Sequence, residues 1–121
     1  MRVHVYWNLN RRCWSVRAAQ GERCGRVVAY LDRVTLTDCR MVIQQAGLRK
    51  TRSSGVKNVH AYIKGLWVEP EPIEGALVAI TYNPWLEGRF VRRDTRQIVH
   101  QARVCQFTIK RDGGPWCAAS L

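Results

Sequence analysis

Two short His-x-Tyr motifs have the residue types and spacing that could do chemistry. His4 and Tyr6 form the first motif, and His60 and Tyr62 form the second. Side chains two positions apart project from the same face of a β-strand, so each motif would place an imidazole beside a phenol. If the two strands are neighbours, these rings could stack on nucleobases next to the cations of Arg2 and Lys64. The alternatives are acid–base chemistry by histidine, and polar cross-strand pairs that only cover the sheet.

Signatures of known enzyme chemistries are absent from the sequence. It contains no Gly-x-Ser-x-Gly, no phosphate-binding loop and no His-Glu-x-x-His. Its nine acidic residues form no obvious pair for a metal-dependent nuclease. We therefore expect no enzyme, no catalytic residues, no cofactor and no metal site. A phosphodiesterase that uses His4, His60 and His100 is the remaining enzymatic alternative.

The charge of the chain points to an anionic partner. Its 121 residues include 20 Lys+Arg and 9 Asp+Glu, which gives a net charge of +11, and 16 of the cations are arginine. Arginine grips phosphate bidentately and stacks on bases, although codon bias also enriches it. Residues 1–64 carry 13 cations and three acids, whereas residues 65–121 carry seven cations and six acids. Codon bias does not remove acids from one half, so this asymmetry predicts a basic face built by the first half.

Two stretches of that first half concentrate the positive charge. Arg11 and Arg12 lie between two predicted strands, and the segment 44–57 contains four cations and no acid. We expect both stretches to join one nucleic-acid or partner-binding face, made of Arg11, Arg12, Arg49, Lys50, Arg52, Lys57, His60, Tyr62 and Lys64. Trp85 follows Asn83-Pro84 in a predicted turn, where it could anchor a protein partner or cap the core.

Alternation of apolar and polar residues with a period of two predicts the elements that position these groups. Strands are expected at 2–7, 13–18, 26–31, 34–36, 39–44, 56–68, 76–82, 89–92, 97–102 and 104–110, and the first two should form a hairpin with a basic tip. Segment 44–57 should form one short helical turn and then a loop. The predicted core residues on the apolar faces are Val3, Val5, Trp7, Trp14, Val59, Ile63 and Trp67. The fold class is all-β or β-rich α+β, a small antiparallel sandwich or barrel with at most one or two short helices.

The predicted domain organisation is a single domain over residues 1–121, with a possible hinge at 69–75, where Pro70 and Pro72 interrupt the strand pattern. The five cysteines contain no closely spaced pair, which argues against a disulfide framework and against structural zinc. Most of these thiols should lie in the core, and Cys117 is expected to be the exposed one. No run of about 18–20 apolar residues could cross a bilayer, so a membrane partner is not expected.

Motifs spread over most of the chain resemble a family of small phage and prophage accessory proteins. They are Val5-Tyr6-Trp7-Asn8, Cys13-Trp14-Ser15-Val16-Arg17, Gly25-Arg26-Val27-Val28, Lys57-Asn58-Val59-His60-Ala61-Tyr62 and Thr81-Tyr82-Asn83-Pro84 before Phe90-Val91. The resemblance implies a protein made in the cytoplasm of a bacterial host. Two functions fit: a non-enzymatic module that binds DNA or RNA through its Arg-rich face, or an inhibitor of a host defence or nucleic-acid-processing complex, as anti-CRISPR proteins are.

Overall fold

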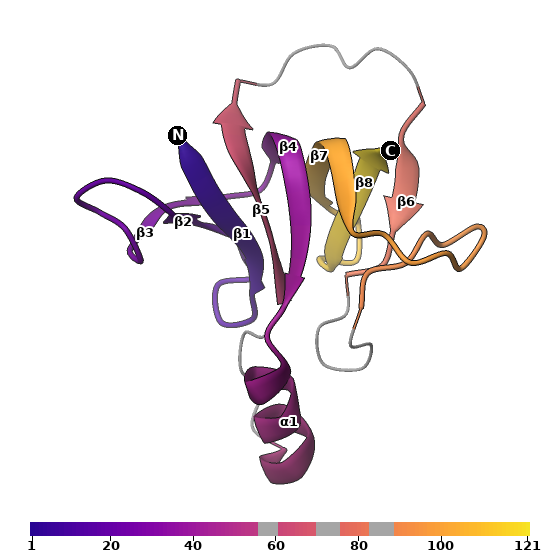
Figure 1. Cartoon of the computed structure of the whole chain (residues 1–121), viewed down its shortest axis with the longest axis horizontal. Coiled ribbons are helices and arrows are strands. Elements are labelled where there is room, and N and C mark those ends of the chain that lie inside the picture. The colour runs from indigo at the N-terminus through magenta and orange to yellow at the C-terminus, as the bar shows by residue number, and fades with distance from the viewer. Residues whose placement is uncertain (56–60, 70–75, 83–88) are drawn as a thin grey trace.

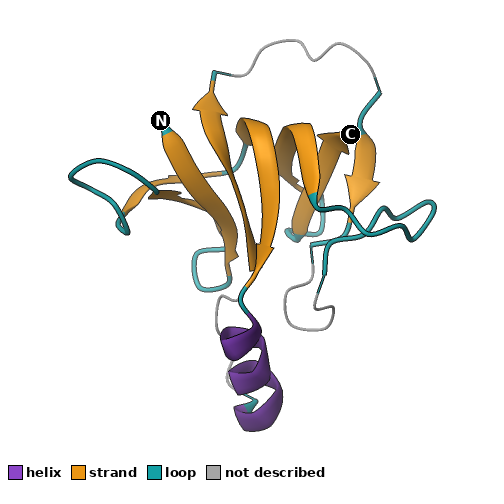
Figure 2. Ribbon diagram, viewed as in Figure 1, coloured by secondary structure: helices purple, strands orange, loops and turns teal. Residues whose placement is uncertain are grey.

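The computed structural model describes residues 1–55, 61–69, 76–82 and 89–121, and its architecture is one antiparallel β-sheet with a short helix (Figures 1 and 2). The elements are β1 (Arg2–Asn8), β2 (Cys13–Ala18), β3 (Val27–Leu31), β4 (Val34–Ile43), α1 (Gln45–Ser54), β5 (Ala61–Val68), β6 (Val78–Ile80), β7 (Gln101–Ile109) and β8 (Pro115–Ser120). The eight strands pair in the order β3-β2-β1-β5-β4-β7-β8-β6. The β-rich fold class predicted from the sequence is confirmed.

The alternating strands bury the face that their sequence predicts. Val3, Val5 and Trp7 of β1 are buried, as is Ile63 of β5, whereas Trp67 is only half-buried. Val59 lies outside the described residues. We call the face opposite this core the outer face of the sheet.

The sheet curls around its core, so that strands distant in the pairing order meet. The Trp14 indole of β2 donates a hydrogen bond to the Thr108 carbonyl of β7, at 2.8 Å. The Tyr82 hydroxyl accepts from the Trp7 backbone N–H at 3.1 Å and donates to the Ala61 carbonyl at 2.9 Å. Edge-to-face contacts join the Trp14 ring to its aromatic neighbours, as such rings prefer. These contacts hold the two ends of the sheet against one core.

Strand β4 corrects the expectation of two strands at 34–36 and 39–44. It runs without a break from Val34 to Ile43, with a register shift against β5 between Thr37 and Arg40. At this bulge Asp38 has a φ of 51°, a left-handed conformation that Asp tolerates better than most residues. The two predicted strands are therefore one continuous strand that contains a bulge.

Segment 44–57 also differs from its prediction, because a helix of ten residues replaces the single turn expected there. Helix-forming Gln, Ala, Leu, Arg and Lys supply most of α1, and buried Leu48 anchors it. Gly55 follows the helix with a φ of 72°, as glycine does at many helix ends. Within the described ranges no helix is long and apolar enough to span a membrane.

The C-terminal third contains the largest errors of the sequence prediction. The strand expected at 76–82 shortens to β6, and 89–92 contributes only the single bridges Ile80↔Arg92 and Val91↔Ile98. The strands expected at 97–102 and 104–110 are replaced by one strand, β7, which begins only at Gln101, and β8 is a strand that the sequence pattern does not predict. Since β8 pairs with β6 and β7, Cys117 is fully buried, contrary to its predicted exposure.

The five thiols should differ sharply in reactivity. Cys39, Cys105 and Cys117 are buried, Cys13 is half-buried and Cys24 is exposed. Contact with Cys105 and burial raise the pKa of the Cys39 thiol well above its ordinary range, so that little reactive thiolate forms. We expect a chromogenic thiol reagent at pH 7.5 to modify Cys24 fast and Cys13 slowly, with the other three reacting only after denaturation. Reaction of a third thiol in the folded protein would contradict this burial pattern.

Candidate nucleic-acid interface

The condition set for the His-x-Tyr motifs, that their strands be neighbours, holds for β1 and β5. His4 lies opposite Lys64 in the pairing register of these strands. The imidazole of His4 stacks on the Tyr62 ring with 4.3 Å between centroids and an interplanar angle of 21°. Both rings lie on the outer face and are half-buried. Tyr6 is almost fully buried, and His60 lies outside the described residues.

The pairing registers extend the His4↔Lys64 pair into a row of side chains across five strands. Directly opposite residues of antiparallel strands share a face, and the partners are Arg17↔His4, His4↔Lys64, Lys64↔Arg40 and Arg40↔Gln101. We call these five residues the cross-strand row. Strands are spaced about 4.8 Å apart, so the three cations fall within about 15 Å on one face. Lys64 and Arg40 are exposed, and Arg17 is half-buried.

Aromatic rings lie beside the cations of this face. The Arg17 guanidinium is 5.3 Å from the centroid of the Tyr6 ring, and the Arg11 guanidinium is 4.0 Å from that of Tyr30. Such contacts hold a guanidinium plane over a ring and leave its edge free for an anion. The Nε atom of Arg17 is buried and has no hydrogen-bond partner in the part of the chain that the structure describes. The outer face thus combines stacking surfaces with unused donors.

The electrostatics of the face favour a neutral imidazole at its centre. Burial, reinforced by the charges of Arg17 and Lys64, lowers the pKa of His4 below its ordinary value of 6.5. The lowered pKa favours the uncharged imidazole, whose ring can offer an aromatic surface. Arg17, Lys64 and Arg40 make no ion pair with any described carboxylate.

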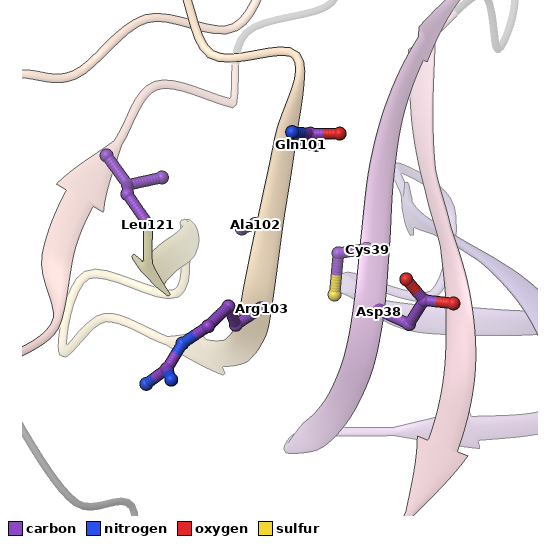
Figure 3. Close-up of a pocket in the computed structure, with 6 residues that line it drawn as sticks. All are labelled: Asp38, Cys39, Gln101, Ala102, Arg103 and Leu121. Carbon is purple, nitrogen blue, oxygen red and sulfur yellow. The ribbon is translucent and has the colours of Figure 1, made fainter.

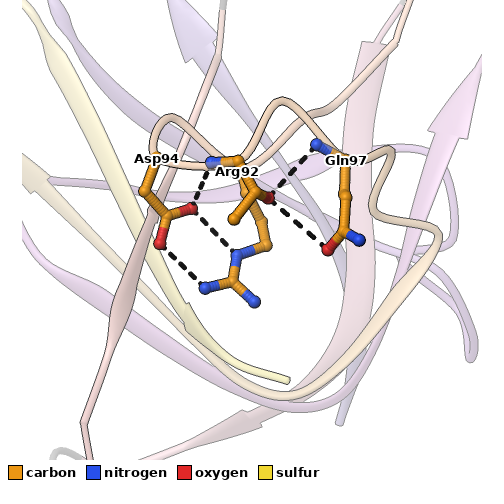
Figure 4. A network of polar contacts seen from close by, with 4 residues as sticks. Arg92, Asp94 and Gln97 are labelled. Atoms are coloured by element: carbon orange, nitrogen blue, oxygen red, sulfur yellow. Dashed lines mark hydrogen bonds and ion pairs between the residues drawn. The ribbon is translucent and has the colours of Figure 1, made fainter.

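Arg92 illustrates the opposite case of a cation that is already paired (Figure 4). Its Nε and Nη2 atoms donate to the two carboxylate oxygens of Asp94 at 3.0 and 2.8 Å. The bond from Arg92 lowers the pKa of Asp94, as an ion pair should. This pair closes the turn in which the Arg92 N–H donates to the Gln97 carbonyl, at 2.9 Å. Arg92 is thus committed to a local turn.

The remaining predicted site residues lie near one end of the sheet or outside the described ranges. β1 and β4 run in the same direction because both are antiparallel to β5, so the hairpin loop after β1 and α1 after β4 lie at the same end (Figure 1). Arg49, Lys50 and Arg52 are exposed on α1 rather than in a loop. Arg12 donates to the Gly113 carbonyl at 3.3 Å. Lys57, His60 and Trp85 fall outside the described residues. So does the predicted hinge at 69–75, except for Glu69.

Sequence reasoning missed two cations of the row. Arg17 could have been found, because the short hairpin of β1 and β2 places it opposite His4. Arg40 had no such signal, since its neighbour Lys64 belongs to a strand reached only after α1. Within the described ranges no three His, Cys, Asp or Glu side chains come together as metal ligands.

Fold and site define a small, strongly basic β-sheet protein with cations and aromatic rings on its outer face. Residues 1–112 match the sequence model of the Mycobacterium phage L5 gene 82 protein family, so the chain belongs to this phage protein family. The gene 82 protein of Mycobacterium phage L5 is 35% identical over 102 residues, which cover 79% of this chain and 81% of that protein. The resemblance to small phage proteins seen in the sequence is confirmed. No solved structure matches the fold.

Proposed function

We propose that this phage protein is a non-enzymatic accessory protein that binds nucleic acid through the outer face of its sheet, in the cytoplasm of the host. The observation that carries the proposal is the cross-strand row, in which three cations that form no ion pair among the described residues accompany a histidine stacked on Tyr62. Phosphate contacts supply affinity without sequence preference, and aromatic faces accept any base.

A single strand suits this face better than a duplex. Bases in a duplex are stacked on one another, whereas a single strand can place them on protein rings. In the row, His4 lies between Arg17 and Lys64, and the Tyr62 ring stacks on its imidazole. A strand that crosses the sheet would therefore meet cations on both sides of a stacking surface. Arg11 over Tyr30 at 4.0 Å extends the same combination toward β3.

The test is a binding titration with labelled oligonucleotides of about 12 nucleotides, a length within the usual site sizes of such proteins. Single-stranded DNA, single-stranded RNA and duplex DNA are compared by fluorescence anisotropy between about 50 and 200 mM salt. We expect single strands to bind more tightly than the duplex, and log K to fall linearly with log salt. Failure to bind any of them more tightly than about 10⁻⁴ M near physiological salt would reject the proposal in favour of an inhibitor that binds a host protein complex.

Tyr62 gives a separate prediction for the stacking part of this interaction. Replacing Tyr62 with Ala should weaken single-strand binding by about 1–3 kcal/mol, because the base loses its aromatic surface. Replacing it with Phe keeps the ring and should leave affinity nearly unchanged. Both variants are titrated as above after their circular dichroism spectra match that of the parent protein. Equal affinities of the Ala and Phe variants would show that Tyr62 only covers the sheet.

A further inference from the structure

A small pocket opens beside the cross-strand row where β4 bulges. It has a volume of about 210 Å³ and is lined by Arg2, Asp38, Cys39, Arg40, Lys64 and Gln101. Pockets for drug-sized ligands begin at about 300 Å³, so this one suits a smaller group. Only Arg40, Lys64 and Gln101 also belong to the row.

The backbone is built to form this pocket. The register between β4 and β5 shifts between Thr37 and Arg40, and Asp38 takes a φ of 51° there. Strand β5 accommodates the bulge with Gly65, where a Cβ atom would come within 2.7 Å of the Thr37 carbonyl oxygen. Bulges of this kind redirect side chains and are common beside functional sites. Here the bulge brings Asp38 to the pocket and keeps Arg40 aligned with Lys64.

The charge of the pocket matches a dianion. Its three cations and one carboxylate leave two positive charges. The one ion pair among them, Arg2 with Asp38 at 3.8 Å, joins side chains that are 55% and 74% exposed, and such pairs are weak. Arg2 can therefore turn to a ligand at little cost. A phosphate monoester carries about −1.5 to −2 charges at pH 7, whereas an internal phosphodiester carries one.

We propose that this pocket binds a phosphate monoester, held by Arg2, Arg40 and Lys64 with the Gln101 amide as a further donor. The group could be the terminal phosphate of a nucleic acid strand or the phosphate of a free nucleotide. The first of these ligands rests on the proposed function, because the rest of the nucleic acid strand would then occupy the adjoining cross-strand row. The preference of the pocket for a dianionic phosphate does not depend on nucleic-acid binding by the row.

A second pocket gives room for the rest of such a ligand. It has a volume of about 260 Å³, lies along β4 and β7, and shares Asp38, Cys39 and Gln101 with the first (Figure 3). In the figure the Asp38 carboxylate points toward β5, away from Arg103 on the far side. The Arg103 Nη2 atom donates to the Ser120 hydroxyl at 3.4 Å. A sugar or base attached to the bound phosphate can lie in this space.

The first arm of the test uses small molecules and so does not depend on polynucleotide binding. Adenosine monophosphate and its 3′,5′-cyclic form, which carries one charge less, are titrated into the ¹⁵N-labelled full chain and followed by amide shifts. We expect the monophosphate to bind about fivefold to tenfold more tightly, with the largest shifts at residues 38–40, 64–66 and 101–103. Equal affinity for the two nucleotides, no binding of either, or shifts confined to other residues would overturn the inference.

The second arm uses variants and strand ends. Arg2→Gln lies in the pocket but outside the row and should abolish the preference for the monophosphate. Arg17→Gln lies in the row but outside the pocket and should preserve that preference. An oligonucleotide with a 5′-phosphate is then compared with its 5′-hydroxyl form. Tighter binding of the phosphorylated form identifies a strand end as the ligand, and equal binding identifies a free nucleotide. Loss of the preference in Arg17→Gln but not in Arg2→Gln would refute the placement.

Discussion

Replacing Arg17, Lys64 and Arg40 together with Gln is expected to weaken single-strand binding by up to about 100-fold, because three charge contacts at up to about 1 kcal/mol each are lost. The slope of log K against log salt should become shallower by about two units, at roughly 0.7 per phosphate contact. The row places these side chains on one face of four adjacent strands, β2, β1, β5 and β4. Anisotropy titrations at several salt concentrations measure both quantities.

A matched control separates this face from general charge. Arg23, Arg26 and Arg33 are exposed cations outside the row, and the corresponding triple Gln variant removes the same net charge. We expect it to retain most of the affinity and the slope. If both triple variants lose affinity equally, binding depends on net charge alone, and the outer face has no special role.

A third variant tests how far the face extends toward α1. Arg49, Lys50 and Arg52 are exposed on this helix and contribute few core contacts. Their replacement with Ala should lower the salt slope by up to about two to three units if the helix joins the binding face. An unchanged slope would confine the interface to the sheet and would refute the continuous face predicted from sequence.

Replacing Trp14 with Ala should destabilise the fold by about 3–5 kcal/mol, the usual cost of removing a large buried aromatic side chain. Trp14 is fully buried. The centroid of its ring lies 4.8–5.2 Å from the ring centroids of Trp7, Tyr82 and Phe107. Its indole N–H also ties β2 to β7 through Thr108. The loss is a large share of a typical folding free energy. Urea denaturation followed by circular dichroism measures it.

Trp116 provides the control for this core prediction. It is half-buried on β8, and the Arg93 guanidinium lies 5.0 Å from the centroid of its ring. Its replacement with Ala should cost no more than about 1–2 kcal/mol, because a cation–π contact and part of a buried surface are lost. Comparable losses for the Trp14 and Trp116 variants would contradict the central place of Trp14 in the curled sheet.

The β-rich class, the β1–β2 hairpin and the buried faces of β1 and β5 could be predicted because each depends on residues close in sequence. A strand exposes alternate side chains to opposite sides, so Val3, Val5 and Ile63 identify a core face without any knowledge of their partners. Burial of that face then stabilises the association of the strands into a sheet. The basic character of the chain was likewise a property of composition.

Which strands became neighbours, apart from the β1–β2 hairpin, was decided only by tertiary structure. β4 joins β5 and β7 through pairs such as Leu36↔Trp67 and Leu36↔Cys105, whose sequence separation leaves no local signal. β8 shows the same limit, because only its pairing with β6 and β7 places it in the sheet. The cross-strand row and the pocket at the bulge exist because these long-range registers bring Lys64 and Arg40 together. Register is set by the packing of the whole buried face, and no single strand contains that information.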